Sequence, residues 1–339
     1  MKILPEHIKA LRGFGYTQSE ARFLYIVATH SGYFTQPHFC QFTNTKSGCV
    51  PTGFTAKLIA RKHANQRRYQ SNAPVFHLTH KPIYRAIRKE NIRNRRAHSL
   101  EYVKTRLAIL DFILAHPHHD YFEGESDKVQ YFQERLQIPP QEMPSRTYAG
   151  SNHVPDTIRY FVDKFPLFLD STVAGQPLLT LSYIDPGFES LSGFKTHLLA
   201  YAAFLSRLPR FAFLFASPHA HLFPKARRMF EERLNTKPGK LSAHVARYFR
   251  LRSSWEAKRY EALSNDDLEF LNHAKQCFAG ELFDSAYAKW QAGKLSERDF
   301  ANQLERGAGR GQEIHFETFV LPRDYTPFGQ NSQFLREPS

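Results

Sequence analysis

Three acidic residues in the middle of the chain could do chemistry with a metal ion. Asp156 stands just before a predicted strand, Asp185 closes a predicted strand over 177–185, and Glu189 comes four residues after it. A divalent cation such as Mg²⁺ needs at least two converging hard oxygen ligands. Asp156 and Asp185 could supply them, with Glu189 as a third. The same acids could instead cap or terminate elements of the fold.

The arrangement resembles the PD-(D/E)xK nuclease-like core. In that core, carboxylates at strand ends hold Mg²⁺ and a nearby lysine helps to activate the attacking water. Lys195 is the nearest lysine candidate here. Two positions depart from the pattern, because Tyr183 stands where the wider class has an acid and Gly187 where the motif lysine would lie. We predict a degenerate site with no metal and no cofactor, and a Mg²⁺ site of the three acids and Lys195 is the alternative.

Basic residues are concentrated in one short segment. The chain has 339 residues, with 46 Lys and Arg against 32 Asp and Glu and a net charge of +14. Between Lys46 and Arg96 lie 13 bases and one acid, Glu90, whereas residues 97–339 hold 29 charges of each sign. Solubility does not require such concentration, but a polyanion-binding surface does, because each neutralised phosphate releases condensed counterions. A solvated basic face is the alternative.

The elements that must position these charges are predicted in residues 1–98. The first helix opens with a capping box of Thr17 and Glu20 and ends near Gly32. The following expected elements are a helix from Thr35, a helix over about Thr52 to Ala64, strands over 67–70 and 75–78, and a helix from Thr79. This order is that of a winged helix-turn-helix, whose third helix can enter the DNA major groove while the hairpin lies against the backbone.

The candidate DNA contacts follow from this assignment. Phosphate contacts set affinity and register, while one or two side chains on the helix choose the sequence. The candidates on the third helix are Thr52, Thr55, Lys57, Arg61 and Lys62. Those that would line the wing are Arg67, Arg68, Gln70 and Asn72. Those expected to add backbone contacts are Arg85, Arg88, Lys89, Arg93, Arg95 and Arg96.

The sequence after residue 98 is expected to form further structural units. Residues 99–150 are expected to form an apolar helix followed by a linker. This helix either braces the first domain or pairs with its copy in a dimer. Residues 151–235 read as strand, strand, helix, strand and helix, which predicts a small nuclease-like α/β domain. Residues 236–310 predict a helical extension and residues 311–339 a tail. The expected fold class is α+β or α/β, with a winged helix-turn-helix domain first and helices after the α/β domain.

The stretch Leu179 to Ser190, with the helix that contains Leu198 to Tyr201, resembles the C-terminal domain of the replication-relaxation family. That family joins an N-terminal winged helix to such a domain and occurs on plasmids and integrative elements. The resemblance covers about residues 15–235 and rests on pattern and order more than on single motifs. It implies a mobile-element protein that binds specific double-stranded DNA, as a transcriptional regulator or as a replication or transfer accessory factor.

Two other functions remain open at this point. One is a metal-dependent nickase or relaxase-like enzyme, and the other is an architectural protein that recruits a protein partner through residues 151–310. Most sequence-specific DNA-binding proteins with a winged helix-turn-helix bind inverted repeats as two-fold homodimers, so for the DNA-binding function we expect a homodimer.

Composition argues against several other classes. No apolar run approaches the roughly 18 residues of a membrane span, and residues 1–9 already carry charges, so we expect no membrane association and no secretory leader. Three cysteines suit the reducing cytoplasm better than a disulfide scaffold. A zinc site is not expected, because the spacing of its candidate ligands is irregular. Those candidates are His38, Cys40, Cys49 and His63.

Overall fold

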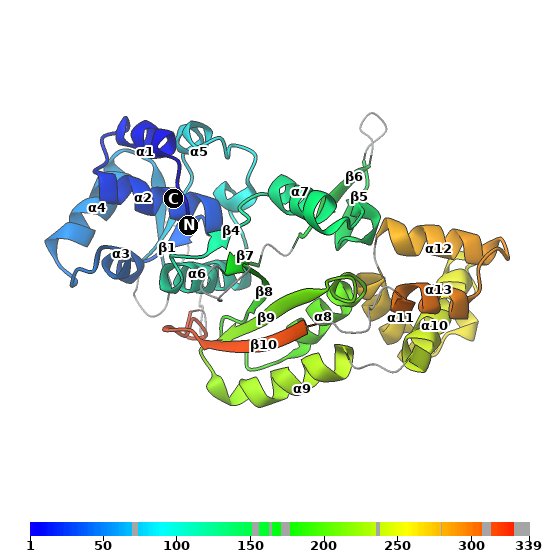
Figure 1. Ribbon diagram of the computed structural model, residues 1–339. Coiled ribbons are helices and arrows are strands. Elements are labelled where there is room, and N and C mark those ends of the chain that lie inside the picture. Colours follow the sequence, from blue (N-terminus) through cyan, green and yellow to red (C-terminus); the bar gives the residue numbers. More distant parts are fainter. Residues whose placement is uncertain are drawn as a thin grey trace.

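Figure 1 shows the computed structural model of the chain, which is a mixed α+β protein with helices and several sheets. The structure describes residues 1–69, 74–150, 156–162, 165–170, 177–234, 238–278, 280–306 and 313–328. Within these residues no helix combines the length and the apolar character that a membrane crossing requires.

The N-terminal part combines helices with a three-stranded antiparallel sheet of order β1-β3-β2. Phe34 pairs with Phe76 and Arg67 with Val75, so β3 is the central strand and β2 an edge strand. The elements are α1 (Pro5–Arg12), α2 (Gln18–His30), β1 (Tyr33–Phe34), α3 (Gln36–Thr43), α4 (Cys49–Ala60), β2 (Ala64–Arg68), β3 (Pro74–Leu78), α5 (Lys81–Ala86) and η1 (Arg93–Arg95).

The capping box predicted for α2 is present. The Glu20 amide donates to Thr17 Oγ1 at 3.2 Å, and the Thr17 amide donates to Glu20 Oε2 at 2.8 Å. These two bonds satisfy donors that the first turn of a helix leaves without partners. The helix that they start is buried along nearly its whole length and forms the centre of the N-terminal part.

Aromatic side chains hold α4 in place against this centre. The rings of Phe39 on α3 and Phe54 on α4 stack with centroids 4.2 Å apart, and Phe23 on α2 meets the Phe54 ring at 5.8 Å. All three side chains are almost fully buried. Burial of one such ring contributes about 1.5–3 kcal/mol, so α4 has one firmly anchored side.

The second unit is built on a five-stranded mixed sheet of order β10-β9-β8-β7-β4. Strands β8, β9 and β10 run parallel, and β7 is antiparallel to both β8 and β4. The strands are β4 (Asp120–Tyr121), β7 (Leu167–Asp170), β8 (Leu178–Ile184), β9 (Arg210–Ser217) and β10 (Glu313–Val320).

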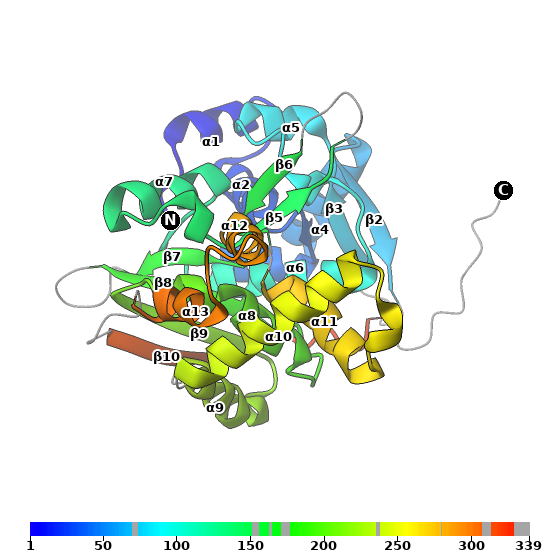
Figure 2. The same ribbon diagram turned by 90° about the vertical axis from the view of Figure 1, so that its right-hand side faces the viewer.

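Helices cover both faces of this sheet, with α6 (Leu100–Ala115) above it and α9 (Phe223–Leu234) below it in Figures 1 and 2. On one face, Phe213 of β9 meets Phe230 of α9 at 5.1 Å. On the other face, Phe112 of α6 meets Phe168 of β7 at 5.9 Å. A strand covered on both sides requires a continuous apolar run, which explains the apolar sequence of β9.

The other elements complete the second unit and add a helical group with a core of its own. That core contains Phe249, Leu271, Phe283 and Phe300. The elements are α7 (Glu125–Leu136), η2 (Pro140–Glu142), β5 (Ser145–Tyr148), β6 (Thr157–Tyr160), α8 (Ser192–Leu205), η3 (Ala220–Leu222), α10 (Pro238–Glu256), η4 (Tyr260–Ala262), α11 (Asn265–Cys277), α12 (Glu281–Gln291) and α13 (Glu297–Arg306). Strands β5 and β6 form a separate antiparallel hairpin.

Two regions differ from the expected organisation. Residues 313–320 lie in the expected tail, yet they form β10, which pairs in parallel with all of β9. Their alternation of polar and apolar residues is typical of a strand with one solvated face. The expected linker before residue 150 contains β4, α7 and β5, so it is part of the folded second unit.

The segment Leu321–Phe328, which we call the C-terminal strap, runs back from β10 into the N-terminal part. Leu321, Tyr325 and Phe328 belong to the buried cluster that the N-terminal part shares with α6 and one face of the five-stranded sheet, and the Phe328 ring stacks on Tyr69 at 5.9 Å. Lys104 of α6 also donates to the Thr326 carbonyl at 3.2 Å. The strap therefore ties the end of the sheet to the first domain.

A buried cluster of charged and polar groups fastens the strap. Asp111 of α6 is fully buried, and its carboxylate accepts a hydrogen bond from the Tyr325 hydroxyl at 2.6 Å and one from the Arg323 guanidinium. His38 Nε2 of α3 lies 3.2 Å from the same carboxylate. Burial opposes ionisation of Asp111, but His38, Arg323 and Tyr325 together hold the pKa of this carboxyl below its usual value.

Two buried histidines make stability depend on pH. Burial lowers the pKa of His30 to about 3 and that of His77 to about 4. Both are neutral in the folded state, whereas in the unfolded state they bind protons below about pH 6.5. The free energy of unfolding therefore has its full value above that pH, and it decreases as the pH falls toward about 4, because the unfolded state binds protons that the folded state does not. Urea unfolding followed by circular dichroism should give a free energy of unfolding lower by about 1–2 kcal/mol per histidine near pH 5 than near pH 7.

The control for this prediction is a variant set. His77→Gln should reduce the difference between the two pH values, whereas His118→Gln, at an exposed position, should leave it unchanged. Equal free energies of unfolding near pH 5 and near pH 7 in the unaltered protein would contradict the assignment.

Candidate nucleic-acid interface

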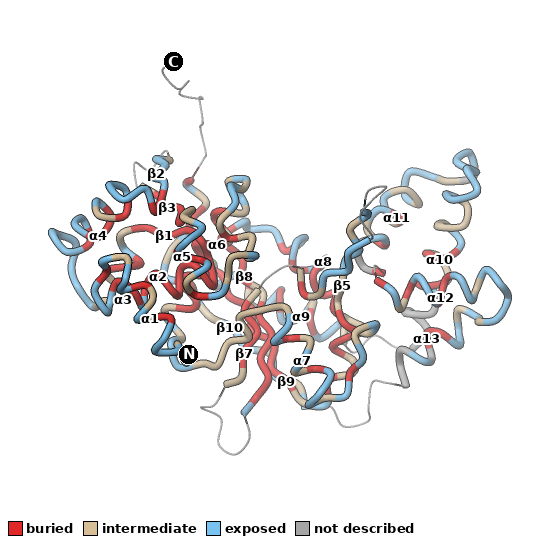
Figure 3. Tube along the Cα trace, turned by 90° about the horizontal axis from the view of Figure 1, so that it is seen from above, coloured by how far each residue is buried: buried red, intermediate tan, exposed pale blue. Residues whose placement is uncertain are grey.

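The side of α4 that faces away from the core is open. Thr52, Gly53 and Ala56 are exposed along it, whereas Phe54 and Leu58 on the other side are buried. Figure 3 places α4 at the end of the molecule opposite α10 to α13. The helix is therefore packed on one side, and its exposed residues include these small side chains together with Val50 and Ile59.

Two predicted contact residues of α4 are engaged within the protein. Thr55 is 4% exposed, and its hydroxyl donates to the Pro51 carbonyl at 3.0 Å and accepts from the Gln36 amide at 3.1 Å. The Lys57 ammonium lies 2.8 and 2.7 Å from the two carboxylate oxygens of Glu20. The Thr55 hydroxyl is thus turned into the structure, and the Lys57 charge is balanced by a carboxylate.

The end of α4 carries two exposed cations. Arg61 donates to the Phe14 carbonyl and lies 5.6 Å from the centre of the Tyr16 ring, which orients its guanidinium. Gly15 has a φ of +80°, and a Cβ there would lie too close to this guanidinium. A glycine at this position therefore allows both the left-handed backbone and the close approach of Arg61. Lys62 follows in the left-handed region, and its side chain is exposed.

Strand β2 presents further cations beside α4. Among the described residues β2 pairs with β3 alone and is an edge strand, and Asn65, Gln66, Arg67 and Arg68 are all exposed. Figure 3 shows α4 and β2 at the same end of the molecule. The predicted wing residues Gln70 and Asn72 lie outside the described residues. The sequence pattern missed Asn65 and Gln66, because the first strand was expected to begin only at Arg67.

The basic residues that follow β3 are split between different surroundings. Arg85, Arg88 and Arg96 are exposed, and Arg95 is half-buried. Arg93 lies 5.3 Å from the centre of the Tyr148 ring in the β5–β6 hairpin. Arg95 lines a pocket of about 100 Å³ together with Asn65 and Arg67 of β2, whereas Arg93 faces the second unit.

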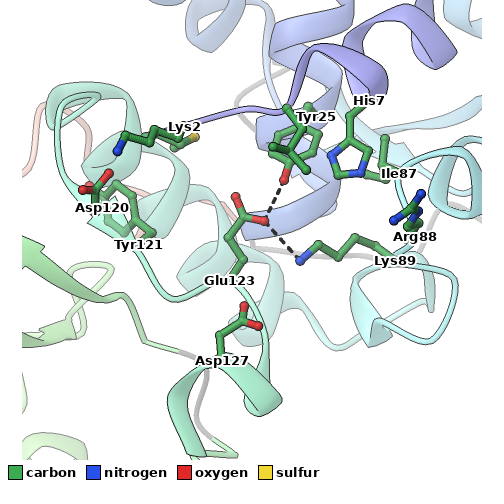
Figure 4. Close-up of a pocket in the computed structure, with 12 residues that line it drawn as sticks. Lys2, His7, Tyr25, Ile87, Arg88, Lys89, Asp120, Tyr121, Glu123 and Asp127 are labelled. Atoms are coloured by element: carbon green, nitrogen blue, oxygen red, sulfur yellow. Dashed lines mark hydrogen bonds and ion pairs between the residues drawn. The ribbon is translucent and has the colours of Figure 1, made fainter. Parts of the chain in front are cut away.

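Lys89 lies in a pocket of about 350 Å³ between the two units (Figure 4). Its ammonium is 3.1 Å from a carboxylate oxygen of Glu123, which also accepts a hydrogen bond from the Tyr25 hydroxyl at 2.7 Å. Burial and the nearby Glu123 raise the pKa of Tyr25, so this hydroxyl stays protonated. The charge of Lys89 is thus balanced within the protein.

The predicted acidic site has Asp185 as its buried member. Asp185 follows β8, and its Oδ1 accepts from the amides of Gly187 at 3.2 Å and Phe188 at 3.0 Å. Its Oδ2 accepts from the Ser217 hydroxyl at 2.8 Å. Oδ1 therefore closes the turn after β8, while Oδ2 ties this turn to the end of β9, so both oxygens have the structural role that was considered above beside metal binding.

The other members of the acidic site lie apart from this turn or on the surface. Asp156 stands beside β6 in the separate hairpin, where it accepts from the Gly150 amide at 2.9 Å. Glu189 and Lys195 are exposed. Among the residues that the structure describes, no group of three or more His, Cys, Asp or Glu side chains is placed to hold a metal ion.

Two of the zinc candidates are also bound within the protein. His38 belongs to the cluster around Asp111, and His63 Nδ1 lies 2.5 Å from the Tyr16 hydroxyl. Cys40 is half-buried, Cys49 is exposed, and both are free thiols. The exposed residues of α4 and β2 are thus the predicted contacts that remain available, and both elements lie at one end of the molecule (Figure 3). No protein-family model, no curated protein and no solved structure matches this chain.

Proposed function

We propose that this protein binds double-stranded DNA sequence-specifically through a winged helix-turn-helix formed by α2, α3, α4 and the sheet β1-β3-β2. The observation that carries the proposal is the position of α4 beside β2: one helix with an open side, next to an edge strand that exposes Arg67 and Arg68. The order helix, strand, helix, helix, strand, strand supports the same assignment.

In this proposal α4 enters the major groove. The small side chains of Thr52, Gly53 and Ala56 allow the helix to approach the base edges closely. The Thr52 hydroxyl can donate to or accept from a base, and the Ala56 methyl suits the methyl group of thymine. Since no cation lies on this side of the helix, the reading of bases depends on these neutral groups.

Phosphate contacts come from the residues around α4. Lys46 precedes the helix, Lys62 follows it, and Arg67 and Arg68 lie on β2, and all four side chains are exposed. Cations flanking a helix in the groove neutralise phosphates on both sides of it and fix its register. Arg67 and Arg68 therefore contribute to affinity for every sequence, whereas Thr52 and Ala56 determine the choice between sequences.

The second unit supports a binding role more than a cleaving one. Both oxygens of Asp185, the buried acid of the predicted site, are engaged, one by amides of the turn after β8 and the other by Ser217 at the end of β9. We therefore propose a regulator or a replication or transfer accessory factor of a mobile element, acting as a homodimer on an inverted repeat.

The proposal is tested by measuring DNA affinity after removal of two charges from the wing. Arg67→Gln/Arg68→Gln should weaken binding to fluorescent duplexes by roughly 30-fold near 0.1 M salt, because two phosphate contacts are lost. The fluorescence anisotropy of duplexes from the region upstream of the gene and of a random duplex reports this change. The loss should be similar for both kinds of duplex, since phosphate contacts carry no sequence information.

The matched control removes the same charge elsewhere. Lys225 and Arg228 are exposed on α9, and Lys225→Gln/Arg228→Gln should keep the affinity within about twofold of the unaltered protein. Retention of full affinity by the wing variant, or equal losses in the two double variants, would overturn the proposed surface.

A further inference from the structure

A larger cavity lies beside the pocket of Figure 4 and shares five lining residues with it. Its volume is about 550 Å³, which is within the range of small-molecule sites. Its walls come from α2, η1 and α6 on one side and from α7 and the β5–β6 hairpin on the other. The shared residues are Arg88, Lys89, Tyr121, Glu123 and Asp127.

Arg106 of α6 lines this cavity and is 3% exposed. Its guanidinium donates to the Ser31 carbonyl at 3.1 Å, to the Asn94 side-chain oxygen at 2.9 Å and to the His30 carbonyl. All three acceptors are neutral, and no carboxylate of the described residues pairs with this cation. A buried charge without a counter-ion is costly, so the cavity adjoins a cation whose charge is not balanced within the described structure.

The carboxylates that line the cavity are bound to other groups. Glu123 is paired with Lys89 and Tyr25, as described above. Glu125 accepts from Arg159 Nε at 2.6 Å and from the Tyr160 amide at 2.8 Å. Asp127 accepts from the Gly124 amide at 2.8 Å at the start of α7. These acids are thus engaged by other groups, and in the described structure none of them forms an ion pair or a hydrogen bond with Arg106.

The aromatic part of the lining suits a flat apolar body, beside a wall that is otherwise largely polar. The Tyr102 ring lies 5.7 Å from the Arg106 guanidinium, and the Tyr148 ring lies 5.3 Å from that of Arg93. His30 is 9% exposed and lines the same cavity, and its Nε2 is buried without a hydrogen-bond partner. Unpaired polar groups and aromatic walls in one cavity are typical of a ligand site.

We propose that this cavity binds a small organic anion, with an aromatic body against the tyrosines and a carboxylate or phosphate group beside Arg106 and Arg93. The anion supplies a counter-ion for the Arg106 guanidinium, and its aromatic ring packs against Tyr102 and Tyr148 in the cavity wall. This inference goes beyond DNA binding. It depends on none of the residues of α4 or β2, so each proposal can fail without the other.

The experiment is isothermal titration calorimetry on the full chain with two anions and their neutral counterparts. The probes are adenosine monophosphate against adenosine, and salicylate against salicylamide. At least one anion should bind with one-to-one stoichiometry and at least about tenfold more tightly than its neutral counterpart, because charge-assisted hydrogen bonds favour the anion. Binding of the phosphate or of the carboxylate probe alone identifies which acidic group the site prefers.

Two variants localise the site. Arg93→Gln, at a half-buried position, should weaken the anion at least about fivefold, whereas Arg85→Gln, at an exposed position that does not line the cavity, should change the affinity less than about twofold. Arg106→Lys keeps the charge and should also weaken binding, provided that its thermal unfolding shows a folded protein. Failure of both anions to bind, equal binding of neutral probes, or unchanged binding by Arg93→Gln would overturn the proposal.

Discussion

Replacement of Asp111 by alanine is expected to lower the free energy of unfolding by about 3–5 kcal/mol. The carboxylate is fully buried and joins α3, α6 and the C-terminal strap through His38, Arg323 and Tyr325. Its removal leaves the buried Tyr325 hydroxyl and His38 without this acceptor, while the half-exposed Arg323 guanidinium keeps Gln41 Oε1 and the Pro37 carbonyl. Urea unfolding monitored by circular dichroism measures the change.

The matched control lies on the same helix. Glu101→Ala removes an exposed carboxylate from the first turn of α6 and should cost no more than about 1 kcal/mol. Arg323→Ala should cost less in the Asp111→Ala background than in the unaltered protein, by at least about 1 kcal/mol, because the two groups interact directly. An Asp111→Ala variant within about 1 kcal/mol of the unaltered protein would refute the importance of this cluster.

Duplex binding is expected to weaken by about 10²- to 10³-fold when the salt concentration rises from about 50 to about 200 mM. The reason is the number of exposed cations around α4 and β2: about four phosphate contacts release about four counterions, and the affinity then falls steeply with salt. The contacts considered are those of Lys46, Lys62, Arg67 and Arg68. Fluorescence anisotropy at a series of salt concentrations gives the slope directly.

The wing variant supplies the comparison for this slope. Arg67→Gln/Arg68→Gln should make the plot of log affinity against log salt shallower by about two contacts. The Lys225→Gln/Arg228→Gln control should keep the original slope. An affinity that changes less than about threefold over this salt range would show that the cationic surface does not bind phosphates.

The local elements of the N-terminal part could be predicted because their signals are local. The capping box of Thr17 and Glu20 lies at the expected start of α2, and the expected third helix overlaps α4. The boundaries moved by a few residues, since α4 begins at Cys49 and β2 at Ala64. Helix ends depend on turn geometry, here the left-handed Asn44 and the extended Gly48, which hydrophobic spacing does not reveal.

The arrangement of the distant parts could not be predicted in this way. Strand β10 pairs with β9 across a long stretch of intervening helices, and the strap reaches α3 and α6. Such contacts depend on tertiary packing rather than on propensity. The same reason explains why the basic segment, continuous in sequence, divides in space: Arg67 stays on the open edge, while Lys89 turns to Glu123. The clustering of basic residues in the sequence does not show which of them will face the same surface in the fold.

The strap has a consequence for how the protein is made. Asp111 leaves the ribosome 212 residues before Arg323, its partner in the buried cluster. During that interval the N-terminal part already has His38 beside this carboxylate but lacks Arg323 and Tyr325, and domains fold while synthesis continues. Products that stop before the strap therefore have an incomplete buried cluster, which lowers the stability of the N-terminal part and exposes it to quality-control proteases.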